Sequence, residues 1–360
     1  MVSCPAESDR SVRLNIRDLA RHLNVSIGTV SRALNGRTDV SDDTRRRVVE
    51  AARTLNYVPN QSGRSLRQGM TGMIAAMIPT SEDKPLADTI FMSVLEGLRE
   101  YLDDRGLDLM VLICGPEEQA YAYLRRTVER RLADGILISD TLRVDPRIDY
   151  LLERQIPFVA FGRSQSAGHY PWVDLDVESI ADQAVARLTG LGHTRIALAQ
   201  REGHINYTYL LVEACQDALR RRGVPFDPHL IFQAPGTEEG GHRLGEALIG
   251  MSDPPTAVIL TGDTMAIGLY RRLAEAGIRP GRDMAIIGFQ ETPNGRFLLP
   301  KLTCFRGDHQ RLGARLGEAL LATMPAYASE LPAPLIQMRW PLEMIVGESD
   351  SHPPRGLGRG

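Results

Sequence analysis

The 360-residue sequence predicts an all-α head at the N-terminus, followed by a two-lobed α/β body built on parallel sheets. Two observations support this division. Residues 16–60 hold three short helical patterns and a run of arginines, whereas short apolar strands alternate with amphipathic helices from about Thr71. Alternating strands and helices of this length are typical of parallel sheets covered on both faces.

The head reads as a helix-turn-helix with a third, supporting helix. Apolar residues recur at helical spacing in each of its three segments. Ser26 is placed to cap the second helix and Ser41 the third, and Asn35-Gly36 ends the second. In such a unit the second helix enters the major groove of DNA. The residues expected to face inward are Ile16, Leu19, Ala20, Leu23, Val30, Ala33, Leu34, Val48, Val49, Ala52 and Leu55.

Charge is distributed unevenly along the chain. Residues 10–69 hold twelve arginines against five acidic residues, a net charge of +7, although the whole chain carries −3. That leaves −10 for the remainder. A basic head on an acidic body concentrates the attraction for phosphate at one end. A solvated basic tail is the alternative that charge alone leaves open.

The exposed side of the second helix supplies the candidate DNA-reading residues. Thr29, Ser31 and Arg32 can donate to phosphates or base edges, and Arg32 can form a bidentate pair with guanine. Ile27 can contact a thymine methyl group, and Gly28 allows close approach to the groove. The alternative for Arg32 is a surface arginine without a DNA contact.

The body contains more strand–helix units than one compact domain needs. Two lobes side by side fit better, with the chain crossing near residues 161–163 and a ligand cleft outside the carboxyl ends of the strands. The predicted strands are TGMIAAMIP, LDLMVLIC, GILIS, PFVAFG, RIALAQ, AVILTGD and MAIIGFQ. Helical stretches between them include SVLEGLREYLDDRG, AYLRRTVERRLADG, ADQAVARLTGLG, LLVEACQDALRRRG and MAIGLYRRLAEAG, several of which end on the glycine that a left-handed cap prefers.

Domain boundaries follow from these patterns. We expect a disordered leader over residues 1–12, the helix-turn-helix domain over 13–58, a hinge or linker over 59–70, the body over 71–348 and a disordered tail over 349–360. Within the body, lobe one is expected at about 71–162 and 292–323, and lobe two at about 163–291 and 324–348.

Several other classes of protein are disfavoured. The four cysteines lie far apart without CxxC spacing, so no disulfide framework, zinc site or cofactor is expected. The start of the chain has no apolar signal-peptide core and no run is long enough for a membrane span, which predicts a cytoplasmic protein. The sequence has no nucleophile elbow, phosphate loop, HExxH or complete GxGxxG after a strand, which argues against an enzyme. A secreted sugar-binding protein would share the body but would not need the head.

The chain resembles the lactose-repressor/galactose-repressor (LacI/GalR) family of bacterial transcription regulators. The motifs are VSIGTVSRALNG, VSDDTRRRV, LNYVPN, PFVAFGR, VDLD, LGHTRIAL, TAVILTGD, IIGFQETP and LTCFR, over about residues 12–349. The resemblance implies a periplasmic-binding-protein-like body, a homodimer or dimer of dimers on a palindromic operator, and a small-molecule effector, usually a sugar. Release of a repressor by its effector and dependence on a corepressor both stay open.

The resemblance also extends the DNA-binding set. Ile27 and Gly28 stand where the family reads bases; both are small and apolar, so readout is expected to lean on Thr29, Arg32 and the hinge. Residues 60–67 resemble the family's hinge helix, with Leu66 as a wedge into the minor groove or, alternatively, a linker residue resting on the body. Gly63 replaces the usual alanine there, at a cost of about 1 kcal/mol in a helix. The full predicted DNA-binding set is Ser26, Ile27, Gly28, Thr29, Ser31, Arg32, Asn35, Tyr57, Asn60, Arg64 and Leu66.

For the effector, four polar candidates and one aromatic follow the strands of the body. Asp263 can accept two sugar hydroxyls or, alternatively, cap the helix that starts at Met265. Arg163 suits a hydroxyl pair or, alternatively, an interlobe ion pair with Asp174 or Asp176. The remaining three are family effector positions, Asn206, Tyr207 and Gln290, of which Gln290 replaces the usual Asp and so favours a neutral ligand.

Two further aromatic residues complete the candidate effector site. Phe91 matches a family aromatic that packs on a sugar ring, with a core phenylalanine as the alternative. Trp172 is expected in the wall of the cleft or, alternatively, packed against the second lobe. The set is neutral and directed at hydroxyl groups, so we expect an uncharged saccharide such as a glucoside, not a phosphorylated sugar or a nucleobase.

Overall fold

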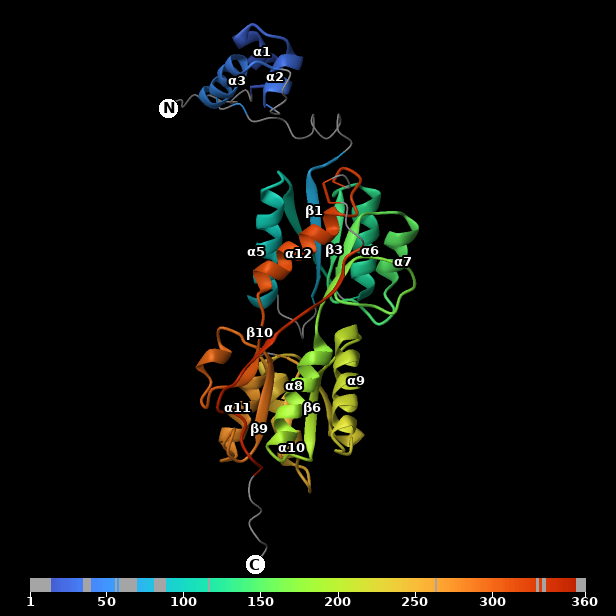
Figure 1. The fold of residues 1–360 in the computed structure, drawn as a ribbon, viewed down its shortest axis with the longest axis vertical. Helices are drawn as coiled ribbons and strands as arrows, with labels where there is room; N and C mark the ends of the chain where they lie inside the picture. The colour runs from blue at the N-terminus through green and yellow to red at the C-terminus, as the bar shows by residue number, and fades with distance from the viewer. Residues whose placement is uncertain are drawn as a thin grey trace, which may run out of the picture. The chain divides into compact units, whose positions relative to one another are not determined.

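The computed structural model describes residues 14–34, 40–55, 57, 70–80, 89–115, 117–262, 264–327, 330–331 and 335–353. The chain divides into two compact units, residues 1–71 and residues 72–360 (Figure 1). This division agrees with the change of sequence pattern at about Thr71. The predicted leader and most of the predicted hinge lie outside the described residues.

The first unit contains the three predicted helices, α1 (Ile16–Leu23), α2 (Ile27–Leu34) and α3 (Asp42–Thr54). Both predicted caps are confirmed: the Ser26 hydroxyl accepts from the Thr29 amide at 3.0 Å and the Ser41 hydroxyl from the Thr44 amide at 3.3 Å. The buried core consists of Leu19, Ala20, Val30, Ala33, Val40, Val48, Ala52 and Tyr57.

One predicted core residue of the head is wrong. Val49 is 50% exposed, whereas Val48 and Ala52 are buried. Residues four apart lie on the same face of a helix, and the neighbouring position is turned about 100° away from it. The buried stripe of α3 therefore follows Val48 and Ala52 and leaves Val49 in solvent.

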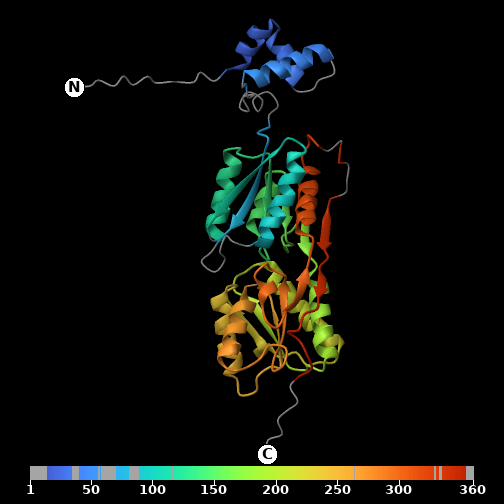
Figure 2. The same ribbon diagram turned by 90° about the vertical axis from the view of Figure 1, so that its left-hand side faces the viewer.

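The first lobe of the body is a six-stranded sheet in the order β11-β5-β4-β3-β1-β2, in which every pair of neighbours is parallel. Helices α5 and α12 lie side by side (Figures 1 and 2), and an added Cβ at Gly313 of α12 would lie 1.9 Å from the Val94 carbonyl oxygen of α5. Glycine is therefore required at this approach. The elements are β1 (Met73–Pro79), α5 (Thr89–Asp103), β2 (Asp108–Cys114), α6 (Glu117–Glu129), β3 (Gly135–Ile138), α7 (Pro146–Glu153), β4 (Phe158–Phe161), β5 (Trp172–Leu175), α12 (His309–Leu321) and β11 (Gln337–Trp340).

The second lobe repeats this architecture, with strand order β12-β10-β9-β8-β6-β7 and one antiparallel pair, β10 with β12. Helices α8 and α9 pack with one apolar cluster and α10 and α11 with another. The elements are α8 (Val177–Gly190), β6 (Ile196–Arg201), α9 (Asn206–Arg221), η1 (Pro228–Leu230), β7 (Ile231–Ala234), α10 (Glu238–Ile249), β8 (Ala257–Leu260), α11 (Met265–Glu275), β9 (Ala285–Gln290), η2 (Gly295–Phe297), β10 (Thr303–Arg306) and β12 (Glu343–Ile345).

All seven predicted body strands are present, but the lobe boundaries differ from those expected. Strand β5 still belongs to the first sheet, so the chain crosses after it and not near residues 161–163. Strand β10 belongs to the second sheet, and β11 returns to the first. Strands of three or four residues next to a crossover show too little periodicity for the sequence to assign them to a lobe. Their pairing partners decide which sheet they join.

The C-terminal segment after β12 is ordered further than predicted. Ser349 and Asp350 are buried, whereas the sequence predicts a disordered tail over residues 349–360. The Ser349 hydroxyl donates to the Ile286 carbonyl and accepts from the Thr303 amide, and Asp350 pairs with Arg187. These bonds fix residues 349–353 against the second lobe; residues 354–360 lie outside the described part.

His193 fastens this C-terminal segment and gives the protein a testable pH dependence. One ring nitrogen lies 2.8 Å from the Thr256 hydroxyl and the other 2.7 Å from the Ser351 carbonyl oxygen. Burial lowers the pKa of His193 below its ordinary 6.5, more than the Ser351 carbonyl and Asp350 raise it. The folded protein thus binds fewer protons than the unfolded chain, so this contribution to stability is lost as pH falls below about 6.5.

We expect His193→Gln to weaken that pH dependence. The urea midpoint of the wild type should fall between pH 7 and pH 5.5, and the variant should show a smaller fall over the same interval. The comparison is the change in midpoint with pH, because the substitution also alters stability at neutral pH. An equal fall in both proteins would assign the pH dependence to other groups.

Among the helices of the described residues, none combines the length and the apolar character needed to cross a membrane.

Candidate functional site

The exposed face of α2 carries the predicted DNA-reading residues. Ile27 is 40% exposed and Arg32 is exposed, while Thr29 and Ser31 are half-buried. An added Cβ at Gly28 would lie 3.7 Å from Arg32 Nη1, so Arg32 lies along the same face as Gly28. The Ser26 and Thr29 hydroxyls are 2.8 Å apart, which binds these two side chains to each other at the start of the helix.

Other members of the predicted DNA-binding set are placed differently. Tyr57 is only 8% exposed and belongs to the core of the head, where its ring packs with the apolar residues of the three helices. Asn35, Asn60, Arg64 and Leu66 lie outside the described residues.

We expect Gly28→Ala to change the stability of the head and its affinity for DNA in opposite directions. The nearest atoms to the new Cβ are 3.6 Å away or more, which is ordinary van der Waals contact. Replacing glycine by alanine in a helix stabilises it by about 0.5–1 kcal/mol, so thermal unfolding of the head should shift upward. DNA affinity should fall, because the methyl group occupies space on the face predicted to approach the bases. An unchanged affinity would place Gly28 away from the groove.

In the second lobe, two predicted effector residues lie near the carboxyl ends of the strands. Tyr207 stacks on Phe289 with ring centroids 5.9 Å apart, and its hydroxyl lies 3.5 Å from the Thr261 carbonyl oxygen. Gln290 ends β9 next to Phe289, and its Oε1 is 2.6 Å from His309 Nε2 at the start of α12. Asp263, the third predicted residue of this group, lies outside the described residues. Helix α11 begins at Met265, as predicted.

Asn206 joins the two lobes. Its side chain is 2% exposed and donates from Nδ2 to the Arg163 carbonyl at 2.8 Å, while its backbone amide donates to the Thr141 carbonyl at 2.8 Å. Asn206 Oδ1 is buried without a hydrogen-bond partner. An unsatisfied buried acceptor is costly, so this oxygen is suited to accept a bond from a molecule that enters the junction.

Arg163 forms ion pairs within the protein, as the alternative interpretation of this residue predicts. Its Nε donates to Asp174 at 2.7 Å, and its two terminal nitrogens donate to the Glu178 carboxylate at 2.8 and 2.9 Å. Burial opposes the charge of Arg163, but the bonds and charges of Glu178 and Asp174 outweigh it and raise the pKa of the guanidinium above its ordinary value. Asp174 is in the first sheet and Glu178 is in α8, so the pair spans the crossover, while Asp176 caps α8.

The two remaining aromatic candidates lie in the first lobe. Phe91 is 9% exposed and stacks on Phe161 at 6.1 Å between ring centroids. Trp172 is half-buried in β5, packs against the core of the first lobe and lies under the Arg163 guanidinium at 5.6 Å. Its packing partner is thus the first lobe, not the second as in the alternative.

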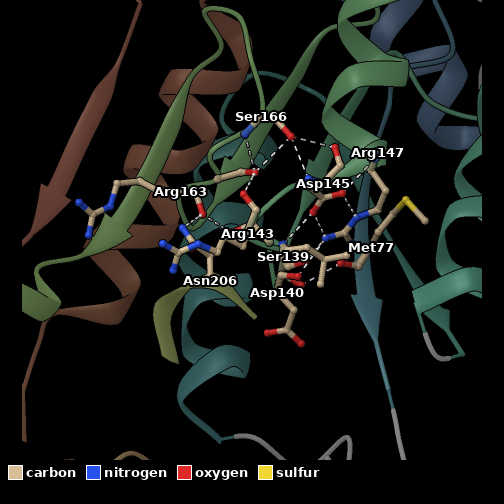
Figure 3. Close-up of polar contacts among 12 residues, drawn as sticks. Met77, Ser139, Asp140, Arg143, Asp145, Arg147, Arg163, Ser166 and Asn206 are labelled. Atoms are coloured by element: carbon tan, nitrogen blue, oxygen red, sulfur yellow. Dashed lines mark hydrogen bonds and ion pairs between the residues drawn. The ribbon is translucent and has the colours of Figure 1, made fainter. Parts of the chain in front are cut away.

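Sequence reasoning missed a buried ion pair in the first lobe, shown in Figure 3. Asp145 is fully buried and Arg147 is 4% exposed. The carboxylate accepts from Arg147 Nε at 3.0 Å and Nη2 at 2.7 Å, and from the Leu142 amide at 3.0 Å. Nη2 also donates to the Ser139 and Asp140 carbonyls, both at 3.0 Å. The pair therefore fixes the loop that follows β3.

A second missed pair links the lobes. Arg143, in the loop between β3 and α7, lies 2.8 Å from Glu213 of α9. The two residues are 70 positions apart in the chain, and no local pattern could have joined them. In the described part of the chain, no group of three or more His, Cys, Asp or Glu could hold a metal ion.

Comparison with known proteins gives two family matches and several related transcriptional regulators. The family description "Bacterial regulatory proteins, lacI family" matches residues 15–60, and "Periplasmic binding protein-like domain" matches residues 185–349. The HTH-type transcriptional regulator AglR of Rhizobium meliloti is 31% identical over 346 residues, which are 95% of each chain. The HTH-type transcriptional regulator RafR of Escherichia coli is 34% identical over 263 residues, 72% of this chain and 77% of its own.

Solved structures show the same fold. The lac repressor dimer bound to operator and the anti-inducer ONPF superposes with a TM-score of 0.81 at 22% identity, covering 94% of this chain and 99% of that chain. The complex of the transcriptional regulator CelR with cellobiose gives a TM-score of 0.71 at 24% identity, covering 94% and 100%.

A helix-turn-helix head and a two-lobed body with largely parallel sheets define a DNA-binding transcriptional regulator and not an enzyme. The chain belongs to the lacI family of bacterial transcriptional regulators.

Proposed function

We propose that this regulator is a repressor of sugar-utilisation genes that leaves its operator when a small neutral saccharide binds where the two lobes meet. It acts as a homodimer, or a dimer of dimers, on a palindromic operator. Helix α2 reads the major groove through Thr29 and Arg32, with Ser31 beside them. The effector contacts Asn206, Tyr207 and Gln290, together with Phe91, Trp172 and Asp263.

The observation that carries the choice of a neutral ligand is that three arginines in and beside this junction already pair with carboxylates of the protein. Arg143 pairs with Glu213, Arg147 with Asp145, and Arg163 with Asp174 and Glu178. An anionic ligand would have to compete with these carboxylates, whereas hydroxyl groups can bond to neutral acceptors such as Asn206 Oδ1. The cellobiose complex of CelR, a structure of the same fold, supports a saccharide by analogy.

The test combines a ligand screen with DNA binding by the full chain. Neutral mono- and disaccharides are compared with sugar phosphates and nucleosides by thermal shift, since a ligand that binds only the folded state raises the unfolding temperature. The operator is selected from random duplexes and footprinted, with half-sites about one helical turn apart expected.

A neutral sugar that raises the unfolding temperature should also weaken operator binding. A sugar that strengthens operator binding would make the protein a corepressor-dependent regulator instead. Stabilisation by sugar phosphates or nucleosides alone would overturn the proposed ligand class.

A further inference from the structure

One side of helix α9 in the second lobe is bonded to the loop after β3 in the first lobe (Figure 3). The Asn206 amide donates to the Thr141 carbonyl at 2.8 Å, and an antiparallel bridge joins Leu142 to Ile205. The Asn206 side chain adds its 2.8 Å bond to the Arg163 carbonyl. These contacts lie outside the chain crossovers, so they break when the lobes separate at this point.

The same side of α9 carries an ion pair farther along the helix. Asn206, Tyr209 and Glu213 are spaced at i, i+3 and i+7 and therefore share one face. Glu213 lies 2.8 Å from Arg143, and the Arg143 guanidinium lies over the Tyr209 ring at 5.2 Å. The buried Asn206 bonds and the solvent-facing pair thus form one continuous contact between the first lobe and α9.

We propose that Arg143 and Glu213 form an electrostatic clasp that holds α9 against the first lobe and sets how often this side of the body opens. The side chains of Arg143 and Glu213 are 35% and 52% exposed. An ion pair this exposed adds little to the stability of a single rigid unit. Here it acts between two lobes, where even a modest interaction shifts the ratio of open to closed forms several-fold.

The clasp also makes opening sensitive to salt. Exposed charges are screened by ions, whereas the buried Asn206 bonds are not. A body held by both kinds of contact opens more readily as ionic strength rises, without losing the contacts that define its closed form. This mechanism depends on the two-lobed body alone and not on the identity of the effector.

Hydrogen–deuterium exchange of the full chain without added ligand measures this opening directly. The Asn206 amide is protected by its bond to Thr141, so exchange in a peptide covering residues 203–210 reports separation of the lobes. In low salt, Arg143→Glu should speed exchange of this peptide by about three- to tenfold, because attraction becomes repulsion. Glu213→Arg should do the same. The double variant R143E/E213R restores opposite charges and should return exchange toward the wild-type rate.

A matched control removes general effects of charge. Arg125 pairs with Glu129 inside α6 at 3.4 Å, so Arg125→Glu is the same reversal on an exposed pair of the first lobe that does not reach the second. It should leave residues 203–210 at the wild-type rate. Exchange in β3 serves as the fold check, since it should be unaffected in every variant.

The proposal is overturned if both single reversals leave residues 203–210 at the wild-type rate, or if the double variant exchanges no slower than the singles. Faster exchange throughout the first lobe would also overturn it, because the pair would then stabilise that lobe and not the junction. Failure of the sugar screen leaves these outcomes unchanged, which keeps this test separate from the proposed function.

Discussion

Asp145→Ala is expected to lower the free energy of unfolding of the first lobe by about 3–5 kcal/mol, because it leaves a charged arginine buried without its partner. Arg147 is 4% exposed, and its Nη1 already lacks a hydrogen-bond partner. Burial opposes the charge of Arg147, but the bonds that it donates to the Asp145 carboxylate outweigh burial and raise the pKa of the guanidinium. Asp145→Ala removes these bonds, yet an arginine stays protonated at neutral pH, so the variant bears the cost of the buried charge.

The chain contains a specific reporter for this experiment. Both of its tryptophans, Trp172 and Trp340, lie in neighbouring strands of the first sheet. Tryptophan fluorescence in urea therefore follows the first lobe. The midpoint should fall strongly in Asp145→Ala.

A double variant tests the physical reason given for this loss. Asp145→Ala combined with Arg147→Met removes the stranded charge and keeps an apolar side chain of similar length. It should be more stable than Asp145→Ala alone. It should remain below the wild type, because Arg147 also binds the Ser139 and Asp140 carbonyls. If Asp145→Ala unfolds at the wild-type midpoint, the ion pair contributes nothing to the stability of the first lobe.

The parts of the fold that sequence could predict are those coded locally. The alternation of apolar strands with helices gave seven body strands, and Ser26 and Ser41 marked the starts of two helices by cap chemistry. Helix-ending glycines such as Gly223 and Gly277 have positive φ, as expected for left-handed caps.

What sequence could not predict depends on pairing between distant segments. Strand β5 joins the first sheet because it pairs with β4 and β11, and β11 lies more than 160 residues later. The same holds for side chains: the sequence left Arg163 open between a ligand contact and an ion pair with Asp174 or Asp176, and it did not point to Glu178, which accepts from both terminal nitrogens. A residue's chemistry is visible in a sequence, but its availability depends on neighbours that only the fold supplies.

Arg32→Ala should weaken binding to the selected operator by about 1–3 kcal/mol, or roughly 5- to 150-fold. Arg32 is exposed on the same face of α2 as Gly28, on the helix that we propose enters the major groove. Affinity is measured by fluorescence anisotropy over a range of salt concentrations, since phosphate contacts make binding fall steeply with salt.

The way in which the affinity loss depends on operator sequence and on salt distinguishes a base contact of Arg32 from a phosphate contact. If Arg32 binds a base, the loss is concentrated at one base pair of each half-site, and variant operators changed there bind both proteins alike. If it binds a phosphate, affinity falls equally for all sequences and the salt slope decreases by about one. Arg99→Ala provides the control, because it removes the same charge from an exposed position on α5 in the body. Equal affinity of Arg32→Ala and wild type at every salt concentration would remove α2 from the DNA-reading surface.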